Sequence, residues 1–271
     1  MSATLIEVTQ VGDPRLEPYR NIRERDVRRR DDLFIAEGSV VLDALAAASA
    51  FEPVSILLLR NRVEGTRHIL SRFDPSVPAY VVSRDVIDRV AGFPMHRGVL
   101  ALARRRDEPE VRDLLELAPS RVLVASGLAN HDNVGACFRI ASAFGVGVVL
   151  LDGTCADPLY RKAIRVSTGA VLRVPFRHGG ETMTLLDELE RQNYRTIALS
   201  PSGRTSLVDI KASERMALVV GAEGGGLPDA ILDRLETVAI PMATGHDSLN
   251  VAISAAIAFY ALGPVAGANV P

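Results

Sequence analysis

Short apolar runs alternate with helical patterns in the first part of the chain, up to about residue 117. The predicted elements are, in order, a charged helix over 21–33, a strand, a Glu-Gly turn and a helix over 34–48, strands over 55–60 and 77–83, a helix that ends at Gly92, and a strand over 98–106. Continuous apolar runs indicate the strands, and apolar residues that recur every three or four positions indicate the helices. This alternation predicts a small α/β domain.

From Arg121 onward the strands become longer and almost wholly apolar, with loops rich in Gly, Asn and Ser after them. Strands are predicted over 121–128, 146–153, 194–201 and 237–242, helices over 133–145, 157–171 and 182–194, a strand, glycine loop and short helix over 215–232, and a closing helix up to Leu262. Strands without polar alternation indicate a parallel sheet covered on both faces.

A charged stretch with two prolines, 107–120, separates the two regions and is interpreted as a linker with a short helix. We therefore expect one domain over 1–117, with the linker at its end, and a second domain over 118–271.

The closing segment, 240–262, carries the clearest chemical signal. A strand end leads through a polar loop into a helix of Ala, Ile, Val, Phe and Leu, and Ser248 and Asn250 stand where this helix begins. We expect so apolar a helix to be wholly buried. Polar groups at its start must then be paired, and a ligand at a helix N-terminus would pair them.

Two further loops follow apolar strands. In the first, Asn130 or Asp132 caps the predicted helix, Asn133 lies in its first turn, and Arg139 follows among apolar residues. A buried Arg needs a partner, either in a structural ion pair or in a reactive site.

The other loop, GAEGGGLP, contains one ionisable residue, Glu223, among glycines that allow close approach of a ligand. It matches neither the dinucleotide fingerprint nor the phosphate-binding loop of NTPases, and an ordinary tight turn is the alternative. Because ligands bind at the carboxyl ends of parallel strands, we expect all three loops to meet at one edge of the sheet.

Composition excludes several classes of protein. The chain has 271 residues, a formal net charge of −2 and no apolar run typical of a membrane span. The first residues lack the basic start and following apolar core that would indicate a secretory signal. Cys137 and Cys155 lack metal-ligand spacing. We therefore expect a cytoplasmic protein without disulfides or a bound metal.

Most of the positive charge comes from arginine. Arg28 and Arg29, in one cluster, and Arg161 and Arg165, on the helix predicted over 157–171, are candidates for contacts with nucleic-acid phosphates. A guanidinium binds phosphate through two parallel hydrogen bonds. The alternative is that these residues form solvated helix faces.

Three motifs, NVGACFRIASAFG, VVGAEGGGLP and IPMATGHDSLNVAISAAIAFY, occur in this order. They resemble the three motifs of the SpoU (TrmH-type) RNA ribose methyltransferases of the SPOUT superfamily, over about residues 121–262. The segment FIAEGSVVLDALAA also resembles the start of the small N-terminal RNA-recognition domain of many of these enzymes.

The resemblance implies an α/β protein: a C-terminal parallel-sheet domain with a deep trefoil knot, and a smaller N-terminal α/β domain that recognises RNA. It implies S-adenosylmethionine as cofactor, held by the knot loops, and an active site that forms across a homodimer. The family transfers the methyl group to a ribose 2′-hydroxyl of ribosomal or transfer RNA, without a metal.

Motif positions carry over residue by residue. The resemblance gives catalytic roles to Asn133, Arg139, Glu223, Ser248 and Asn250. Its cofactor-binding positions are Leu199, Ser200, Gly221, Glu223, Ile240, Met242, Ser248, Leu249 and Asn250. Arg139 corresponds to the Arg thought to activate the hydroxyl, although Arg is a poor base by itself. We hypothesise that Glu223 holds Arg139 or the Arg of a partner.

The chain departs from the family pattern at four positions. Asn130 and His131 replace an Asp-Pro pair, Ala222 replaces a Ser, and Gly225 replaces a Glu. These changes leave the approach of the substrate and the details of cofactor contacts open.

The leading interpretation is methylation of a ribose 2′-hydroxyl in structured RNA. Ribosomal RNA is favoured over transfer RNA, because a separate N-terminal domain offers extra surface for recognition by shape. The alternatives are methylation of transfer RNA, methylation of a base nitrogen, an RNA-binding or ribosome-assembly protein without turnover, and a generic nucleotide-binding enzyme.

Overall fold

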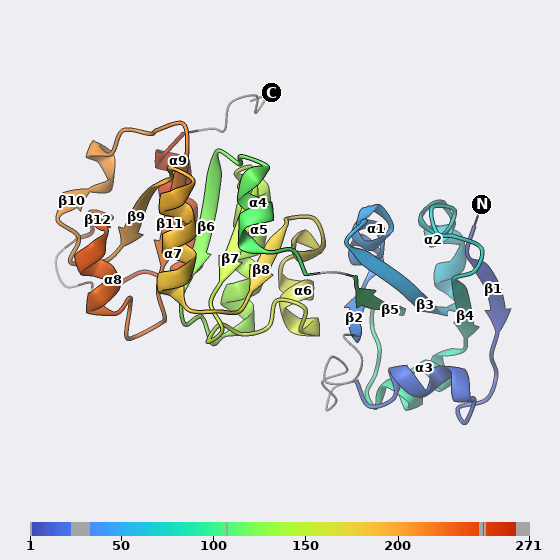
Figure 1. Cartoon of the computed structure of the whole chain (residues 1–271). Coiled ribbons are helices and arrows are strands. Elements are labelled where there is room, and N and C mark those ends of the chain that lie inside the picture. The colour runs from blue at the N-terminus through green and yellow to red at the C-terminus, as the bar shows by residue number, and fades with distance from the viewer. Residues whose placement is uncertain (1, 23–32, 107, 244–245, 247, 264–271) are drawn as a thin grey trace. The chain divides into compact units, whose positions relative to one another are not determined.

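The computed structural model describes residues 2–22, 33–106, 108–243, 246 and 248–263 (Figure 1). The chain forms two compact units. The first unit comprises Met1–Asp107 and Leu159–Arg173, and the second comprises Glu108–Pro158 and Val174–Pro271. The first stretch of this unit thus ends ten residues before the boundary expected after residue 117. The unit also includes a segment from the C-terminal half of the sequence. Most of the charged helix predicted over 21–33 lies outside the described residues.

The first unit is built on a mixed five-stranded sheet with the order β1-β4-β3-β5-β2. Its strands are β1 (Thr4–Glu7), β2 (Leu33–Glu37), β3 (Phe51–Leu59), β4 (Pro78–Val82) and β5 (Val99–Arg105). Strand β4 runs parallel to β1 and β3, whereas β5 runs antiparallel to β2 and β3. The predicted strands are therefore present, and β1 is an additional edge strand.

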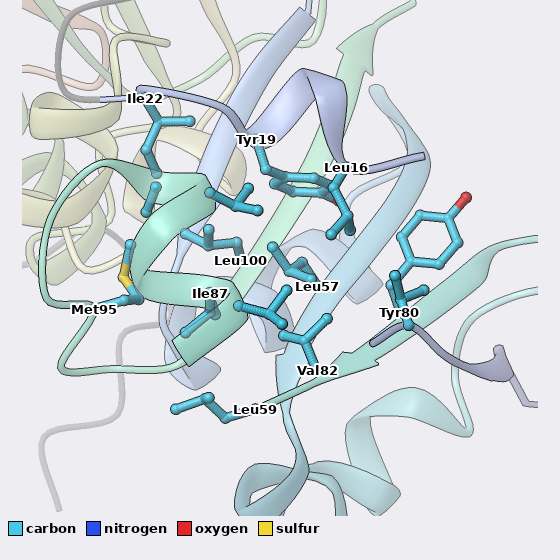
Figure 2. Close-up of a cluster of buried hydrophobic side chains, with 14 of the residues drawn as sticks. Leu16, Tyr19, Ile22, Leu57, Leu59, Tyr80, Val82, Ile87, Met95 and Leu100 are labelled. Carbon is cyan, nitrogen blue, oxygen red and sulfur yellow. The ribbon is translucent and has the colours of Figure 1, made fainter. Parts of the chain in front are cut away.

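Helices of the first unit cover this sheet. They are α1 (Ser39–Ala47), α2 (Val63–Leu70), α3 (Arg84–Ala91) and α6 (Arg161–Val166), with 3-10 turns η1 (Pro14–Tyr19), η3 (Arg60–Arg62) and η4 (Ala170–Leu172). Figure 2 shows one core cluster, in which Tyr19 and Leu16 pack with strand residues such as Leu57 and Leu100. The Tyr19 hydroxyl is hydrogen-bonded to Ser55 Oγ at 2.8 Å, which satisfies both buried groups.

Helix α6 is much shorter than the helix predicted over 157–171. Tyr160 has extended backbone, so the helix starts after it. Thr168 and Gly169 adopt positive φ angles of 56° and 82°, which ends the helical path. A β-carbon on Gly169 would lie 2.9 Å from Ala44 Cβ, so this turn packs closely against α1.

The second unit contains a seven-stranded sheet with the order β10-β12-β9-β11-β6-β7-β8 (Figure 1). Its strands are β6 (Arg121–Ala125), β7 (Val148–Leu151), β8 (Phe176–His178), β9 (Arg195–Leu199), β10 (Thr205–Ser206), β11 (Met216–Val220) and β12 (Glu236–Ala239). All its strand pairs are parallel. Residues of β6, β7 and β11 are buried on both faces, so the predicted α/β fold with a covered parallel sheet is confirmed.

The helices of the second unit are α4 (Val111–Glu116), α5 (His131–Ala143), α7 (Thr182–Arg191), α8 (Asp229–Arg234) and α9 (Val251–Ala261), with a 3-10 turn η5 (Leu207–Asp209). Helices α5 and α9 contact each other, as do α4 and α7. Two strands at the sheet edges, β8 and β10, were not predicted, since neither is a continuous apolar run. No helix in the described part of the chain is long and apolar enough to cross a membrane.

Helix α9 corrects one expectation. Ala255, Ala258 and Phe259 are buried, but Ile253 is 53% and Tyr260 is 78% exposed. The prediction of a wholly buried helix is therefore wrong. An apolar sequence indicates that a helix avoids water, but it does not say which surface excludes the water, and only one face of α9 is covered by described residues of its own chain.

Candidate active site

The three loops meet at the carboxyl edge of the second sheet. The first follows β6, the glycine loop follows β11, and the third runs from β12 to α9. A β-carbon built on Gly127, in the first loop, would lie 3.2 Å from Ala222 Cβ in the glycine loop. Parallel strands bring these segments together although they lie about a hundred residues apart in the sequence.

One hydrogen-bonded group links all three loops. Asn133 Nδ2 donates to Glu223 Oε1. Asn250 Nδ2 donates to Asn133 Oδ1 at 3.0 Å and to Glu223 Oε1 at 3.4 Å. Three of the predicted catalytic residues, one from each motif, therefore touch one another.

Local helix geometry positions the two asparagines. Asn130 is the N-cap of α5, and its Oδ1 accepts from the Asp132 amide at 2.9 Å. Asn133 then falls in the first turn and is only 5% exposed. Asn250 is the N-cap of α9, with Oδ1 accepting from the amides of Ala252 and Ile253 at 3.0 and 3.4 Å. Asn250 thus starts a helix, and Asn133 lies in the first turn of one. Both amide side chains also join the network that links the three loops.

A cavity of about 700 Å³ adjoins this group. Its lining includes every residue predicted to bind a cofactor: Leu199, Ser200, Gly221, Glu223, Ile240, Met242, Ser248, Leu249 and Asn250. Ser202, Asp229 and Ser254 add polar groups, and Val238, Leu227 and Leu232 add apolar surface.

Backbone forms much of the wall of this cavity at the glycine loop. A β-carbon on Gly221 would lie 2.5 Å from Gly226 C, so only glycine fits there. Gly224 and Gly226 have positive φ angles of 86° and 66° and open space where a side chain would project. This loop therefore offers main-chain surface to a ligand.

Arg139 does not join the network. It lies six residues after Asn133 on α5, roughly 120° away around the helix axis, and it is exposed. Within the described residues, no hydrogen bond or ion pair involves Arg139. The expectation that Arg139 is buried with a partner is wrong for a single chain, and Glu223 bonds to the two asparagines instead.

The predicted phosphate-binding residues are elsewhere. Arg28 and Arg29 lie outside the described residues. Arg161 and Arg165 belong to the first unit, where their Nη1 atoms lie 2.8 and 3.9 Å from Glu37 Oε2.

A second polar network, which was not predicted, adjoins the start of the first loop at Ser126 and Gly127. Asp152 follows β7 and is 5% exposed. Its carboxylate accepts from the hydroxyls of Ser126, Thr154 and Thr182 at 2.8, 2.7 and 2.8 Å. It also accepts from the backbone amides of Gly127, Thr154 and Cys155.

These hydrogen bonds keep the carboxylate ionised. Burial alone would raise the pKa of Asp152, but the hydroxyl and amide donors outweigh it and lower that pKa to about 2. The available signal was that Ser126 and Asp152 directly follow neighbouring parallel strands. The sequence could not show that Thr182, at the start of α7, completes the set.

Comparison with known proteins agrees with this arrangement. The model of the SpoU rRNA Methylase family matches residues 120–260, which span all three loops. The chain belongs to this family. The resemblance of the three motifs is therefore confirmed.

Two relatives of this SpoU-family protein extend the match. A Mycobacterium bovis protein, described as an uncharacterised tRNA/rRNA methyltransferase, is 40% identical over 94% of this chain and 90% of its own length. The Nitrosomonas europaea 23S rRNA (guanosine-2′-O-)-methyltransferase RlmB is 32% identical over 65% of this chain and 70% of its own.

A solved structure shows the same fold. The AdoMet-bound rRNA methyltransferase of Sinorhizobium meliloti superposes with a TM-score of 0.79 at 22% identity, covering 95% of this chain and 97% of the other.

Proposed function

We propose that this SpoU-family protein transfers a methyl group from S-adenosylmethionine to a ribose 2′-hydroxyl of structured RNA, with ribosomal RNA favoured over transfer RNA. The observation that carries the proposal is the contact of Asn133, Glu223 and Asn250 beside the cavity. One residue from each family motif contributes to a single group, which is the arrangement that a shared reactive site requires.

The cavity suits the proposed cofactor. Its volume of about 700 Å³ lies within the range of small-molecule sites. Apolar residues such as Leu199 and Ile240 suit a base, whereas the polar groups of Ser248 and Asn250 suit a ribose and an amino acid. The glycine loop lets main chain approach the ligand. When bound, S-adenosylmethionine supplies the electrophilic methyl of its sulfonium.

The residues of the chain then act mainly by positioning. Glu223 accepts from both asparagines and so fixes the loops that line the cavity. Alignment of donor and acceptor atoms contributes a large part of the rate in such transfers. Arg139 is proposed to hold the RNA near the reacting hydroxyl, because a guanidinium binds phosphate well but removes a proton poorly.

A homodimer is part of the proposal. Ile253, Ile257 and Tyr260 recur at helical spacing on the exposed face of α9, and Leu249 precedes them with 40% exposure. Such an apolar stripe is typical of a protein interface. Since α9 packs on α5, which carries the exposed Arg139, an isologous dimer through α9 would bring Arg139 toward the partner subunit.

A deep trefoil knot is the proposed chain path around the cavity. In support, β12 lies between β9 and β10 in the sheet. The approach is tight there, since a β-carbon on Gly203 would lie 2.3 Å from Val238 C.

The test combines cofactor binding with product analysis. We expect calorimetric titration to detect S-adenosylmethionine binding, and radiolabelled methyl to appear in ribosomal RNA more than in transfer RNA. Mass spectrometry of the digested nucleosides should find the label on a ribose. Label on a base, or in transfer RNA alone, would contradict the ribose or the ribosomal part of the proposal. A folded protein that binds RNA but does not bind S-adenosylmethionine would instead support the alternative of an RNA-binding protein without turnover.

A further inference from the structure

Three arginines of the first unit converge on one carboxylate. Glu37 ends β2, Arg97 precedes β5, and Arg161 and Arg165 lie on α6. Arg161 Nη1 is 2.8 Å and Arg165 Nη1 is 3.9 Å from Glu37 Oε2, and Arg97 Nε is 4.0 Å from Oε1. One negative charge therefore faces three positive charges.

Burial separates these arginines into two kinds. The Glu37 side chain is 7% exposed and that of Arg161 is 20% exposed, and the Arg161 guanidinium lies 5.3 Å from the centre of the Phe93 ring. This pair is a partly buried ion pair with good hydrogen-bond geometry, so Arg161 compensates the Glu37 charge.

Arg97 and Arg165 remain more open, with side-chain exposures of 49% and 38%. Their distances to the carboxylate exceed a hydrogen bond, so neither uses its full set of donors on Glu37. Arg97 is nevertheless held in place. Its Nη1 donates to the Glu37 carbonyl at 3.5 Å. A β-carbon built on Gly38 would lie 3.2 Å from Arg97 Nη1, so the side chain packs closely against the backbone there.

The segment that brings Arg165 to this place is strongly basic. Residues 159–173 contain Arg161, Lys162, Arg165 and Arg173 and no Asp or Glu. This segment belongs to the first unit although strands of the second unit precede and follow it. It adds four positive charges to residues 1–107, in which 17 Arg residues stand against 15 Asp and Glu residues.

We propose that Arg97 and Arg165 bind the phosphodiester backbone of the substrate RNA. In this proposal the ion pair of Glu37 and Arg161 holds the two guanidiniums in position. The inference rests on the proposed function for the identity of the nucleic acid. Two half-exposed guanidiniums with free donors around one neutralised ion pair suit a phosphate, which accepts charge-assisted and bidentate hydrogen bonds. Such contacts position the RNA and do not read its sequence.

The test measures RNA affinity directly, without turnover. Binding of a fluorescein-labelled RNA hairpin is followed by fluorescence anisotropy at several salt concentrations. For Arg97→Gln and Arg165→Gln we expect affinity to fall roughly three- to tenfold at low salt, and the slope of log K against log salt to decrease by about 1 for each variant. Arg67→Gln is the matched control, because Arg67 is an exposed arginine of the same unit, paired with Glu64 on α2.

The outcomes separate this inference from the proposed function. Wild-type affinity and salt slope in both variants would overturn the phosphate site, while methyl transfer by the wild type would still support the proposed function. Arg161→Gln provides a second arm: we expect it to lower thermal stability, since it leaves the Glu37 charge buried without its close partner. S-adenosylmethionine binding should be unchanged in Arg97→Gln and Arg165→Gln, so a loss of cofactor binding with normal RNA affinity would also contradict the assignment.

Discussion

Asn250 donates a hydrogen bond to Asn133 at 3.0 Å, across 117 residues of sequence. The bond joins the start of α9 to the first turn of α5, and both side chains also bond to Glu223 in the glycine loop. Because Asn250 caps α9 with its oxygen and uses its nitrogen for this network, one side chain couples the start of the last helix to the wall of the cavity.

These two roles of Asn250 can be separated by substitution. Asn250→Asp retains an oxygen that caps α9 but places a second carboxylate beside Glu223 Oε1, where Asn250 Nδ2 now donates at 3.4 Å. We expect the free energy of unfolding to stay within about 1 kcal/mol of wild type, because the cap is retained. We expect S-adenosylmethionine affinity, measured by calorimetry, to fall at least about tenfold, because repulsion between the introduced carboxylate and that of Glu223 would displace the loops that line the cavity.

Asn250→Ala should lose both the cap and the network. We expect about 1 kcal/mol of lost stability in urea unfolding together with weakened cofactor binding. Asn61→Ala, at an exposed position in η3, is the control. Cofactor binding of wild-type strength in both Asn250 variants would show that the network does not shape the cavity.

Asp152 gives a prediction about acid stability. Its pKa is lowered from an ordinary value of 3.8 to about 2. A carboxyl group with a lowered pKa in the folded state stabilises the protein above its unfolded pKa, and this contribution disappears as the pH falls through the folded pKa. The contribution, about 2 kcal/mol, should therefore be lost between about pH 4 and pH 2.

The measurement compares unfolding free energies of wild type and Asp152→Asn across this range. At neutral pH the variant should be less stable, because an amide nitrogen would face hydroxyl and backbone donors. The gap between the two proteins should narrow by about 2 kcal/mol as the pH falls to 2. Asp113→Asn, on the first turn of the short helix α4, is the control. A gap that is constant with pH would mean that Asp152 is not ionised in the way described.

The exposed stripe on α9 predicts the effect of charge at the interface. Ile257 is 37% exposed, so Ile257→Glu changes the outer face of the helix and leaves the buried Ala255 and Phe259 in place. We expect the wild type to sediment as a dimer and the variant as a folded monomer with little methyl transfer. Leu117→Glu, at an apolar position that is 72% exposed on a different helix end, should remain dimeric. A wild-type monomer with full activity would contradict the proposed dimer.

Much of the site could be predicted from sequence because its signals are local. Asn133, Glu223 and Asn250 each follow an apolar strand of a parallel sheet, and parallel strands carry their following loops to one edge. The cap role of Asn250 could be predicted for a similar reason, since a polar residue before a long apolar run indicates a helix start.

Other features depend on tertiary contacts that no local pattern records. Arg139 falls on the exposed face of α5 because α9 covers a different face of that helix. The segment with Arg161 and Arg165 forms a helix of six residues in the first unit. Asp152 could be recognised as a strand-end residue, but its donors come from three separate segments. In each of these cases the decisive neighbour is far away in the sequence.

Arg139 leads to the most decisive prediction about the dimer. If Arg139 serves the site of the partner subunit, then Arg139→Gln should abolish methyl transfer while S-adenosylmethionine binding stays at wild-type strength, because Arg139 does not line the cavity. Asn250→Ala should also lack transfer, but through its own cavity. Each variant is inactive as a homodimer for a different reason.

Mixing the two variants should therefore restore activity. In a heterodimer of Arg139→Gln and Asn250→Ala protomers, one of the two composite sites contains an intact Arg139 and an intact Asn250. Random exchange of subunits should recover about a quarter of the wild-type rate, since about half of the dimers are mixed and each has one complete site. Co-expression with two different affinity tags isolates the heterodimer, in which about half of the wild-type rate is expected. A purified heterodimer without activity would mean that Arg139 and Asn250 serve the same subunit, and the proposed cross-subunit role of Arg139 would be wrong.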